Sequence, residues 1–194
     1  MRLFVAVELD DALRDALGRL IGDLRRAEGA VKWVEPRHLH LTLKFLGEVA
    51  ESRVADAAQI VRDGATGVPP FRLEARGAGG FPDLRRPRVI FAGAETESDT
   101  ARELARRLNE EMQLLDVPAE DRPFQCHITL GRRRDPRPAP RLAARLEGCA
   151  GRLFGALSVG HVTLMRSILT PTGPIYEPVE RIGLRGGRAM QRGG

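Results

Sequence analysis

Two short segments of the chain repeat the same pair of reactive side chains, an imidazole and a hydroxyl. Residues 40–43 read His-Leu-Thr-Leu, and residues 127–130 read His-Ile-Thr-Leu. Because side chains two residues apart in a β-strand project from the same face, each segment is expected to present its histidine and its threonine together. The aliphatic residues between them then face the core.

If the two segments meet across one groove, they suit phosphoryl transfer without a metal ion. A neutral imidazole can take a proton from water while a protonated imidazole gives a proton to the leaving oxygen. A pKa near ~6.5 makes both forms accessible at neutral pH, and hydroxyl groups can hydrogen-bond the non-bridging oxygens. We therefore expect His40 and His127 to be catalytic, and Thr42 and Thr129 to bind phosphate.

Other interpretations of these residues stay open at this point. A single His-x-Thr in a strand is usually structural, so it is the repetition that favours a functional site. Paired histidines can also bind a metal, but the carboxylates and cysteines are poorly placed for ligation, and we expect no metal and no cofactor. His38 is expected in a loop or at a strand edge, His161 at the surface or in the core, and Cys126 in the core.

The elements that must position the two motifs follow a similar order in both halves of the chain. The spacing of apolar residues and the positions of helix-breaking residues predict four helices. The first is capped at Asp10-Asp11 and ended by Gly29, and the others lie at 52–62, 100–115 and 140–146. They predict strands at 3–9, 31–34, 39–46, 71–75, 88–92 and 124–130, a loop at 77–87, and a closing hairpin of 156–169 with 175–182.

This repeated order predicts an α+β protein with two pseudo-symmetric lobes of antiparallel sheet, covered by helices, and an active-site groove between them. The chain has no Gly-x-Gly-x-x-Gly after a strand and no Gly-Lys-Ser/Thr phosphate loop, which excludes the common nucleotide-binding folds. We expect residues 1–183 to form a single bilobal domain, and residues 184–194 to form a flexible tail rich in glycine and arginine.

The composition is that of an ordinary globular protein. With 194 residues, 42% hydrophobic and 29% charged, the chain is neither fully disordered nor fibrous. No apolar run approaches the ~20 residues that span a bilayer, and the N-terminus turns acidic too early for a signal peptide. We therefore expect a cytoplasmic protein, and the two cysteines lack the spacing of a disulfide framework.

The positive charge is carried almost entirely by arginine. The net charge is +5, and Lys32 and Lys44 are the only lysines among 31 basic residues. The guanidinium fork suits phosphate oxygens, which favours an anionic partner. A GC-rich genome that encodes arginine at tolerated surface positions explains the same excess, so the charge alone does not decide the function.

Residues 31–34 and 39–49 are similar to the first signature of the RNA 2′,3′-cyclic phosphodiesterases, and residues 127–132 to the second. This family, also called 2′-5′ RNA ligases, belongs to the 2H phosphoesterases, which are named for their two His-x-Thr motifs. Further segments match in kind and order at 2–7, 81–88 and 164–176. The chain departs from the family at Cys126, where proline is frequent, and at Gly131, where alanine is usual.

The resemblance implies the 2H phosphoesterase fold and hydrolysis of a terminal 2′,3′-cyclic phosphate on RNA to a 2′-phosphate. It implies His40 as the proton donor to the departing 3′-oxygen and His127 as the proton acceptor that activates water. The same acid and base, with their roles exchanged, would allow reversible joining through a 2′-5′ bond. The expected partner is RNA with a cyclic phosphate terminus, without membrane or metal, and we expect a monomer.

Arg132, Phe45 and Tyr176 are the RNA-binding residues that the resemblance implies. Arg132 lies an odd number of residues after Thr129, so only a strand end or a bulge at Gly131 would turn it into the groove. Phe45 and Tyr176 can stack on a base. Since Phe45 shares its strand face with a core-facing leucine, packing in the core is equally expected for it.

Two other functions remain as alternatives. A 2H phosphodiesterase of this type could act on ADP-ribose cyclic phosphate, other small cyclic nucleotides or 2′-5′ oligonucleotides. A non-catalytic RNA-binding module belongs to a different class, and its salt-sensitive binding would survive loss of both histidines. Binding alone does not need two titratable groups in matched positions, which favours an enzyme.

Overall fold

The computed structural model of the protein describes residues 1–120, 122–171 and 173–186. The α-helices are α1 (Asp11–Arg25), α2 (Val54–Ala65), α3 (Thr100–Glu111) and α4 (Pro140–Glu147), and short 3-10 helices lie at Pro36–His38, Glu51–Arg53 and Met112–Leu115. The strands are β1 (Arg2–Glu8), β2 (Val31–Trp33), β3 (His40–Glu48), β4 (Thr66–Gly67), β5 (Phe71–Phe81), β6 (Val89–Thr96), β7 (His127–Arg133), β8 (Leu153–Val159), β9 (His161–Thr170), β10 (Gly173–Gly183) and β11 (Arg185–Gly186).

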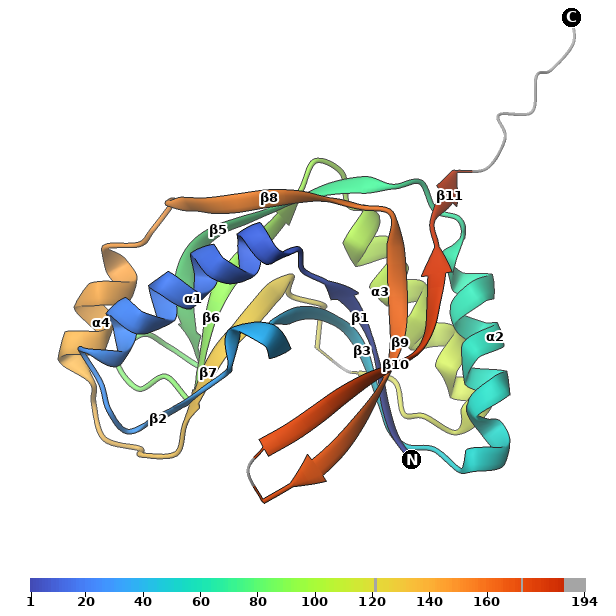
Figure 1. The fold of residues 1–194 in the computed structure, drawn as a ribbon, viewed down its shortest axis with the longest axis horizontal. Helices are drawn as coiled ribbons and strands as arrows, with labels where there is room; N and C mark the ends of the chain where they lie inside the picture. The colour runs from blue at the N-terminus through green and yellow to red at the C-terminus, as the bar shows by residue number, and fades with distance from the viewer. Residues whose placement is uncertain (121, 172, 187–194) are drawn as a thin grey trace, which may run out of the picture.

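Within these residues, nine strands join into one antiparallel sheet (Figure 1). Their order is β10-β9-β1-β3-β7-β6-β5-β8, with β2 paired to β7, while β4 and β11 form a separate parallel pair. The strands that carry the repeated motifs, β3 and β7, are therefore neighbours at the middle of the sheet. This pairing brings together two segments that are far apart in the sequence.

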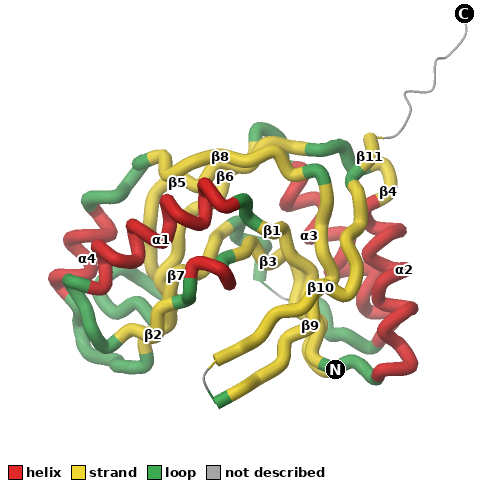
Figure 2. Tube along the Cα trace, viewed as in Figure 1, coloured by secondary structure: helices red, strands yellow, loops and turns green. Residues whose placement is uncertain are grey.

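The sheet divides into two lobes at this central pair (Figure 2). Strands β10, β9, β1 and β3 form one lobe, which contacts α2 and α3, and strands β7, β6, β5 and β8 form the other, which contacts α1 and α4. The predicted α+β fold of two antiparallel lobes covered by helices is confirmed. The lobes are not the two halves of the sequence, however, because β5 and β6 cross to β7 while β9 and β10 return to β1.

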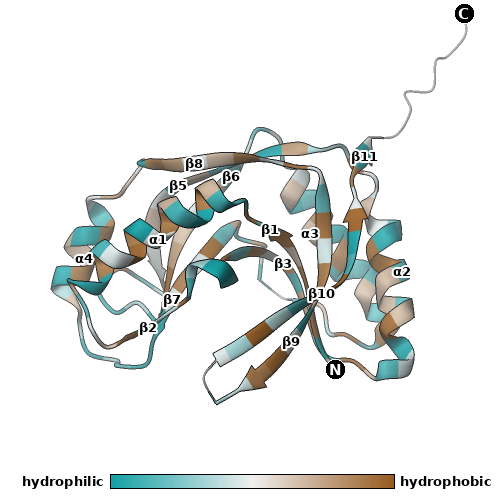
Figure 3. Cartoon of the chain, viewed as in Figure 1, coloured by the Kyte–Doolittle hydropathy of each residue, from teal (hydrophilic) through white to brown (hydrophobic). Residues whose placement is uncertain are grey.

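The core is built from the apolar face of each helix and from the central strands of the sheet, of which β1 is buried on both faces. Helix α1 begins where the side chain of Asp10 accepts a hydrogen bond from the Leu13 amide at 2.8 Å, which caps the helix N-terminus. Its buried residues recur at helical spacing: Leu13, Leu17, Leu20, Ile21 and Leu24. Strand β1 is coloured mostly hydrophobic in Figure 3, as expected of a strand in the interior of a sheet.

The predicted loop at 77–87 is partly wrong, because β5 continues to Phe81. The glycines in this segment make room for neighbouring side chains rather than marking a loop. A Cβ atom on Gly79 would lie 2.6 Å from the ring of Phe91, and one on Gly80 would lie 2.5 Å from Pro87. Glycine therefore lets β5 pass close to these residues.

The closing segment also differs from its prediction. The expected strand 156–169 is interrupted after Val159, so that β8 pairs with β5 in one lobe and β9 pairs with β1 and β10 in the other. The expectation that residues 184–186 belong to a flexible tail is wrong, because Leu184 is buried and Arg185 pairs with Thr66. Residues 187–194 lie outside the described residues.

Candidate active site

The two motifs face each other crosswise at the centre of the sheet. Leu41 of β3 pairs with Ile128 of β7 in antiparallel register. In such a register the preceding residue on one strand lies opposite the following residue on the other. His40 is therefore opposite Thr129, and His127 is opposite Thr42. The pairing brings the four predicted residues together, with each imidazole beside the hydroxyl of the other motif.

A cavity of about 470 Å³ opens on this face of the sheet. Three residues of the two motifs line it: His40, Thr42 and Thr129. The three predicted RNA-binding residues line it as well: Arg132, Phe45 and Tyr176. His127 is not among the lining residues, and its position is defined by the strand register opposite Thr42.

Both imidazoles are held by the same backbone hydrogen bond. Nδ1 of His40 lies 2.7 Å from the carbonyl oxygen of His38, and Nδ1 of His127 lies 2.7 Å from the carbonyl oxygen of Gln125. A carbonyl oxygen can only accept a hydrogen bond, so Nδ1 is the donor in each ring. The other nitrogen, Nε2, is left for a substrate in both motifs.

Aromatic rings flank each imidazole in a similar way. The ring centroids lie 5.0 to 5.6 Å away: Phe4 and Tyr176 beside His40, and Phe81 and Phe91 beside His127. The ring of Tyr176 is nearly perpendicular to that of His40, at 88°, an edge-to-face arrangement that aromatic pairs favour. Packing on two sides limits rotation of each imidazole and holds its Nε2 in one direction.

Burial lowers the pKa of His40 below its ordinary value of 6.5, because a buried ring is harder to charge. The hydrogen bond to the His38 carbonyl opposes this shift in part. The neutral form of His40 is therefore favoured at neutral pH in the unliganded protein.

Cys126 precedes His127 and packs against the core as expected, and burial raises the pKa of its thiol to about 12. Both Cys126 and Cys149 are free thiols.

Each motif is followed by a β-bulge that changes which side chains face the cavity. In β1, Ala6 pairs with Thr42 of β3 and Val5 pairs with Lys44. Leu43, which lies between these two partners, is therefore an extra residue in β3. Likewise, the register between β6 and β7 passes from Thr129 to Gly131 and leaves one extra residue in β7. A bulge shifts the alternation of side chains by one position.

The bulges place Phe45 and Arg132 at equivalent positions on the cavity face. The predicted bulge before Arg132 is confirmed, and this explains how an odd spacing from Thr129 still directs the side chain into the groove. The prediction that Phe45 shares a face with Leu43 is wrong. Phe45 is 52% exposed and lines the cavity, whereas Leu43 is buried.

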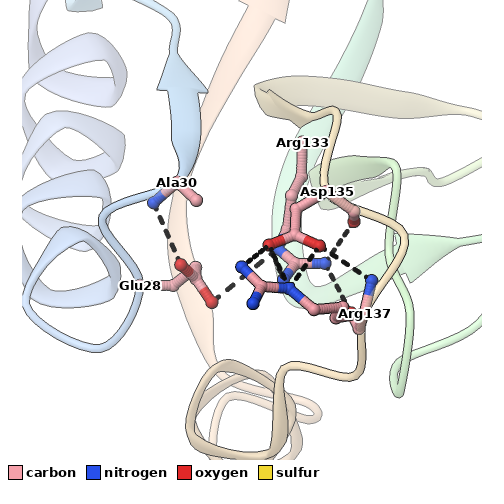
Figure 4. Close-up of polar contacts among 5 residues, drawn as sticks. All are labelled: Glu28, Ala30, Arg133, Asp135 and Arg137. Atoms are coloured by element: carbon pink, nitrogen blue, oxygen red, sulfur yellow. Dashed lines mark hydrogen bonds and ion pairs between the residues drawn. The ribbon is translucent and has the colours of Figure 1, made fainter.

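Arg133, the next residue after Arg132, faces the other way and is buried at the end of β7 (Figure 4). Its guanidinium donates to the carbonyl oxygen of Arg137 at 2.7 Å and forms ion pairs with Glu28 at 3.7 Å and Asp135 at 3.5 Å. Hydrogen bonds from Arg137 lower the pKa of the Asp135 carboxyl to about 2, which keeps it charged. The charge of Arg133 is thus compensated within this cluster.

Part of the cavity wall consists of residues that were not predicted from the sequence. Arg2 and Phe4 of β1 line it, as do Ser167, Leu169 and Pro174 from the β9–β10 hairpin. Figure 1 shows this hairpin projecting from the body of the sheet. The two-residue spacing of Arg2 and Phe4 was a usable signal, although the predicted strand began only at Leu3, and nothing in the hairpin sequence distinguishes it from a surface turn.

The two other histidines, His38 and His161, lie in or close to the environments that the sequence predicted. His38 belongs to the 3-10 turn before β3 and lines the cavity. His161 lies away from the cavity, with Nε2 at 3.4 Å from a carboxylate oxygen of Glu8. Arg181 and Thr163 hydrogen-bond the same carboxylate, and mainly Arg181 lowers the pKa of Glu8 to about 2. His161 thus takes part in a polar cluster that joins β1, β9 and β10.

No group of three or more His, Cys, Asp or Glu side chains is arranged to hold a metal ion in residues 1–120, 122–171 and 173–186. In the same part of the chain, no helix is long and apolar enough to span a membrane.

Comparisons with known proteins point to one family. The model of the LigT-like phosphoesterases matches the chain twice, over residues 7–91 and 93–176, with one motif in each match. A protein of Methanothermobacter thermautotrophicus named RNA 2′,3′-cyclic phosphodiesterase is 40% identical over 180 residues, which cover 93% of this chain and 97% of the relative.

Solved structures agree with this match. The protein TT0787 of Thermus thermophilus is 38% identical, with a TM-score of 0.80 over 96% of this chain and 99% of that chain. LigT of E. coli, solved in complex with 3′-AMP, is 28% identical, with a TM-score of 0.75 over 94% of this chain and 97% of that chain. Both similarities extend over nearly the whole fold.

The two-lobed antiparallel sheet and the doubled His-x-Thr motif define a two-histidine phosphoesterase. Within this class, the chain belongs to the LigT-like phosphoesterase family. The resemblance found in the sequence is confirmed, and with it the expected phosphoesterase class.

Proposed function

We propose that this protein hydrolyses the 2′,3′-cyclic phosphate at the end of an RNA and leaves a 2′-phosphate. The observation that carries the proposal is the crosswise pairing of the motifs, which sets His40 opposite Thr129 and His127 opposite Thr42. Relatives named RNA 2′,3′-cyclic phosphodiesterase support the choice of substrate, including one that is 39% identical over 199 residues.

The proposed reaction uses one imidazole on each side of phosphorus. Nε2 of His127 takes a proton from water, the water oxygen bonds to phosphorus, and the bond between phosphorus and the 3′-oxygen breaks. Nε2 of His40 gives its proton to the departing 3′-oxygen. The hydroxyls of Thr42 and Thr129 donate hydrogen bonds to the non-bridging oxygens, whose negative charge grows in the transition state. The two imidazoles then regain their starting protonation states.

The role of His40 as proton donor requires its charged form, which burial disfavours in the unliganded protein. A bound cyclic phosphate carries a negative charge close to the ring. This charge favours the imidazolium and raises the pKa of His40 as substrate binds. We infer that substrate binding prepares the proton donor, with the Nδ1 hydrogen bond to the His38 carbonyl supporting the positive charge.

Arg132, Phe45 and Tyr176 are proposed to bind the RNA next to the reacting phosphate. The guanidinium of Arg132 suits phosphate oxygens, and the exposed ring of Phe45 can stack on a base.

We further propose a monomeric cytoplasmic enzyme whose chemistry needs no metal, with reversible 2′-5′ joining as a second reaction of the same site. Residues 1–186 are proposed to form one bilobal domain, slightly longer than the sequence suggested.

Product analysis tests this proposal. An RNA oligonucleotide with a 2′,3′-cyclic end is incubated with the protein in EDTA, and the products are compared with 2′- and 3′-phosphate standards. We expect the 2′-phosphate alone. A 3′-phosphate product would contradict the proposed leaving group, and loss of activity in EDTA would contradict the metal-free mechanism. Turnover of small cyclic nucleotides only, or RNA binding without turnover, would favour one of the alternative functions.

A further inference from the structure

Arg2 reaches the cavity from a different part of the sheet than the two motifs. It lies on β1 four residues before Ala6, which pairs with Thr42. At about 3.3 Å per residue, the backbone of Arg2 is about 13 Å along the strand from that position. Its side chain nevertheless lines the cavity. Arg2 therefore enters the cavity from the far end, beyond the place where the reacting phosphate would lie.

The charge in this part of the cavity is uncompensated. No aspartate or glutamate is among the residues that line the cavity. Within the described residues, Arg2 and Arg132 form no hydrogen bond or ion pair through their guanidinium groups. The cross-strand neighbour of Arg2, Glu48, forms an ion pair with the N-terminal ammonium instead, at 3.4 Å. Guanidinium groups without acidic partners in a cavity favour an anionic ligand.

Tyr176 lines the same cavity as the two arginines. It lines the cavity between the β9–β10 hairpin and His40, with its ring centroid 5.2 Å from that of His40. The positive charges of Arg132 and Arg2 both act on the phenol, although burial outweighs them and raises its pKa. Arg2 comes from one lobe and Arg132 from the other, so the same cavity holds a guanidinium group from each lobe and a phenol that stays protonated and able to donate.

We propose that Arg2 and Arg132, together with the Tyr176 hydroxyl, form a second phosphate subsite that binds the phosphodiester preceding the terminal nucleotide. This inference rests on the proposed function and defines its substrate class. The enzyme should prefer an oligonucleotide with a cyclic end to a lone nucleoside cyclic phosphate, because only the oligonucleotide carries a second phosphate to fill the subsite.

The test varies the internal phosphate and Arg2 together. Two dinucleotides with the same bases and the same 2′,3′-cyclic end are compared, one with an internal phosphate and one with an uncharged methylphosphonate. The parent protein should show a kcat/KM about tenfold higher for the phosphate, the loss expected for one charged hydrogen-bonding partner. In Arg2→Met this ratio should fall to about threefold or less, because Arg132 and Tyr176 remain, and Arg2→Lys should restore part of the loss by keeping the charge.

Arg141→Met is the matched control, because Arg141 is exposed on α4 and does not line the cavity. It should keep the preference of the parent protein. Thermal unfolding verifies that each variant is folded. If the parent turns over both dinucleotides but Arg2→Met leaves their ratio unchanged, the second subsite is wrong while the proposed function stands. If the parent turns over neither dinucleotide, the proposed function is wrong, and so is the subsite that rests on it.

Discussion

At the scale of single residues, the backbone rather than another side chain orients each imidazole. The carbonyl two residues before each histidine accepts the Nδ1 hydrogen bond at 2.7 Å, which gives both rings the same tautomer. A carboxylate in that place would stabilise the imidazolium strongly, whereas a carbonyl does so weakly. This arrangement leaves the pKa of His40 free to respond to burial and to the bound phosphate.

The pKa of His40 should therefore change on ligand binding. Because burial lowers this pKa, we expect the imidazole of His40 in the free protein to titrate below 6.5. Inorganic phosphate or a nucleoside 2′-phosphate in the cavity should raise the midpoint, since an anion favours the charged ring. NMR titration of the histidine Cε1 protons measures both values. A free-protein midpoint above 6.5, or no increase on binding, would contradict this account.

Part of the cavity could be predicted from the sequence and part could not. The His-x-Thr repeat predicts His40, Thr42 and Thr129 because a two-residue period is a local property of a strand. Arg2 and Leu169 were missed because their place in the wall depends on which strands pair and how far the β9–β10 hairpin projects. Those features are set by tertiary contacts, and no local pattern encodes them.

At the scale of elements, the two bulges decide which residues reach the cavity. Without them, Phe45 and Arg132 would point toward the core, where a guanidinium would need a buried partner. The sequence suggested a bulge before Arg132 only through the family resemblance, and it gave no sign of one before Phe45. Bulges depend on pairing with the neighbouring strand, so a single strand sequence shows them poorly.

The bulge in β7 also requires a small residue at Gly131. A Cβ atom there would lie 2.7 Å from Cγ1 of Val31 and 2.9 Å from Cε3 of Trp33. Although alanine is usual in the family, we expect Gly131→Ala to lower the free energy of unfolding by about 1–3 kcal/mol through overpacking. Denaturant unfolding measures this change.

Gly22→Ala is the control for that substitution. Gly22 lies within α1, and a Cβ atom added there meets nothing within 4 Å. Alanine should therefore stabilise the protein by about 0.5–1 kcal/mol through helix propensity. Equal effects of the two substitutions would contradict the packing described around Gly131.

At the scale of the whole molecule, the two lobes exchange strands. The similar order of elements in the two halves predicted two lobes correctly. It did not reveal that β5 and β6 pair with β7, or that β9 returns to β1. Helix α1 from the first half contacts β8, and α3 from the second half contacts β3. Sequence periodicity indicates which elements form, but not which of two equivalent partners each strand selects.

This exchange predicts that neither half folds alone. A fragment of residues 1–98 would expose the β6 edge that β7 covers, and a fragment of residues 99–194 would expose the β9 edge that β1 covers. We expect each isolated fragment to lack a cooperative thermal transition by circular dichroism. A fragment that unfolds cooperatively on its own would show that the halves are independent domains.

The central claim is that His40 and His127 act together on one phosphate. The most direct test measures kcat for a dinucleotide with a 2′,3′-cyclic end, in EDTA, for the parent protein, His40→Ala, His127→Ala and the double variant. Each single variant should lose about 10²–10⁴-fold in kcat, as expected for general acid–base catalysis, and the double variant should lose less than the product of the two. His161→Ala, which lies away from the cavity, should stay near the parent value. Activity close to that of the parent in either single variant would contradict the two-histidine mechanism.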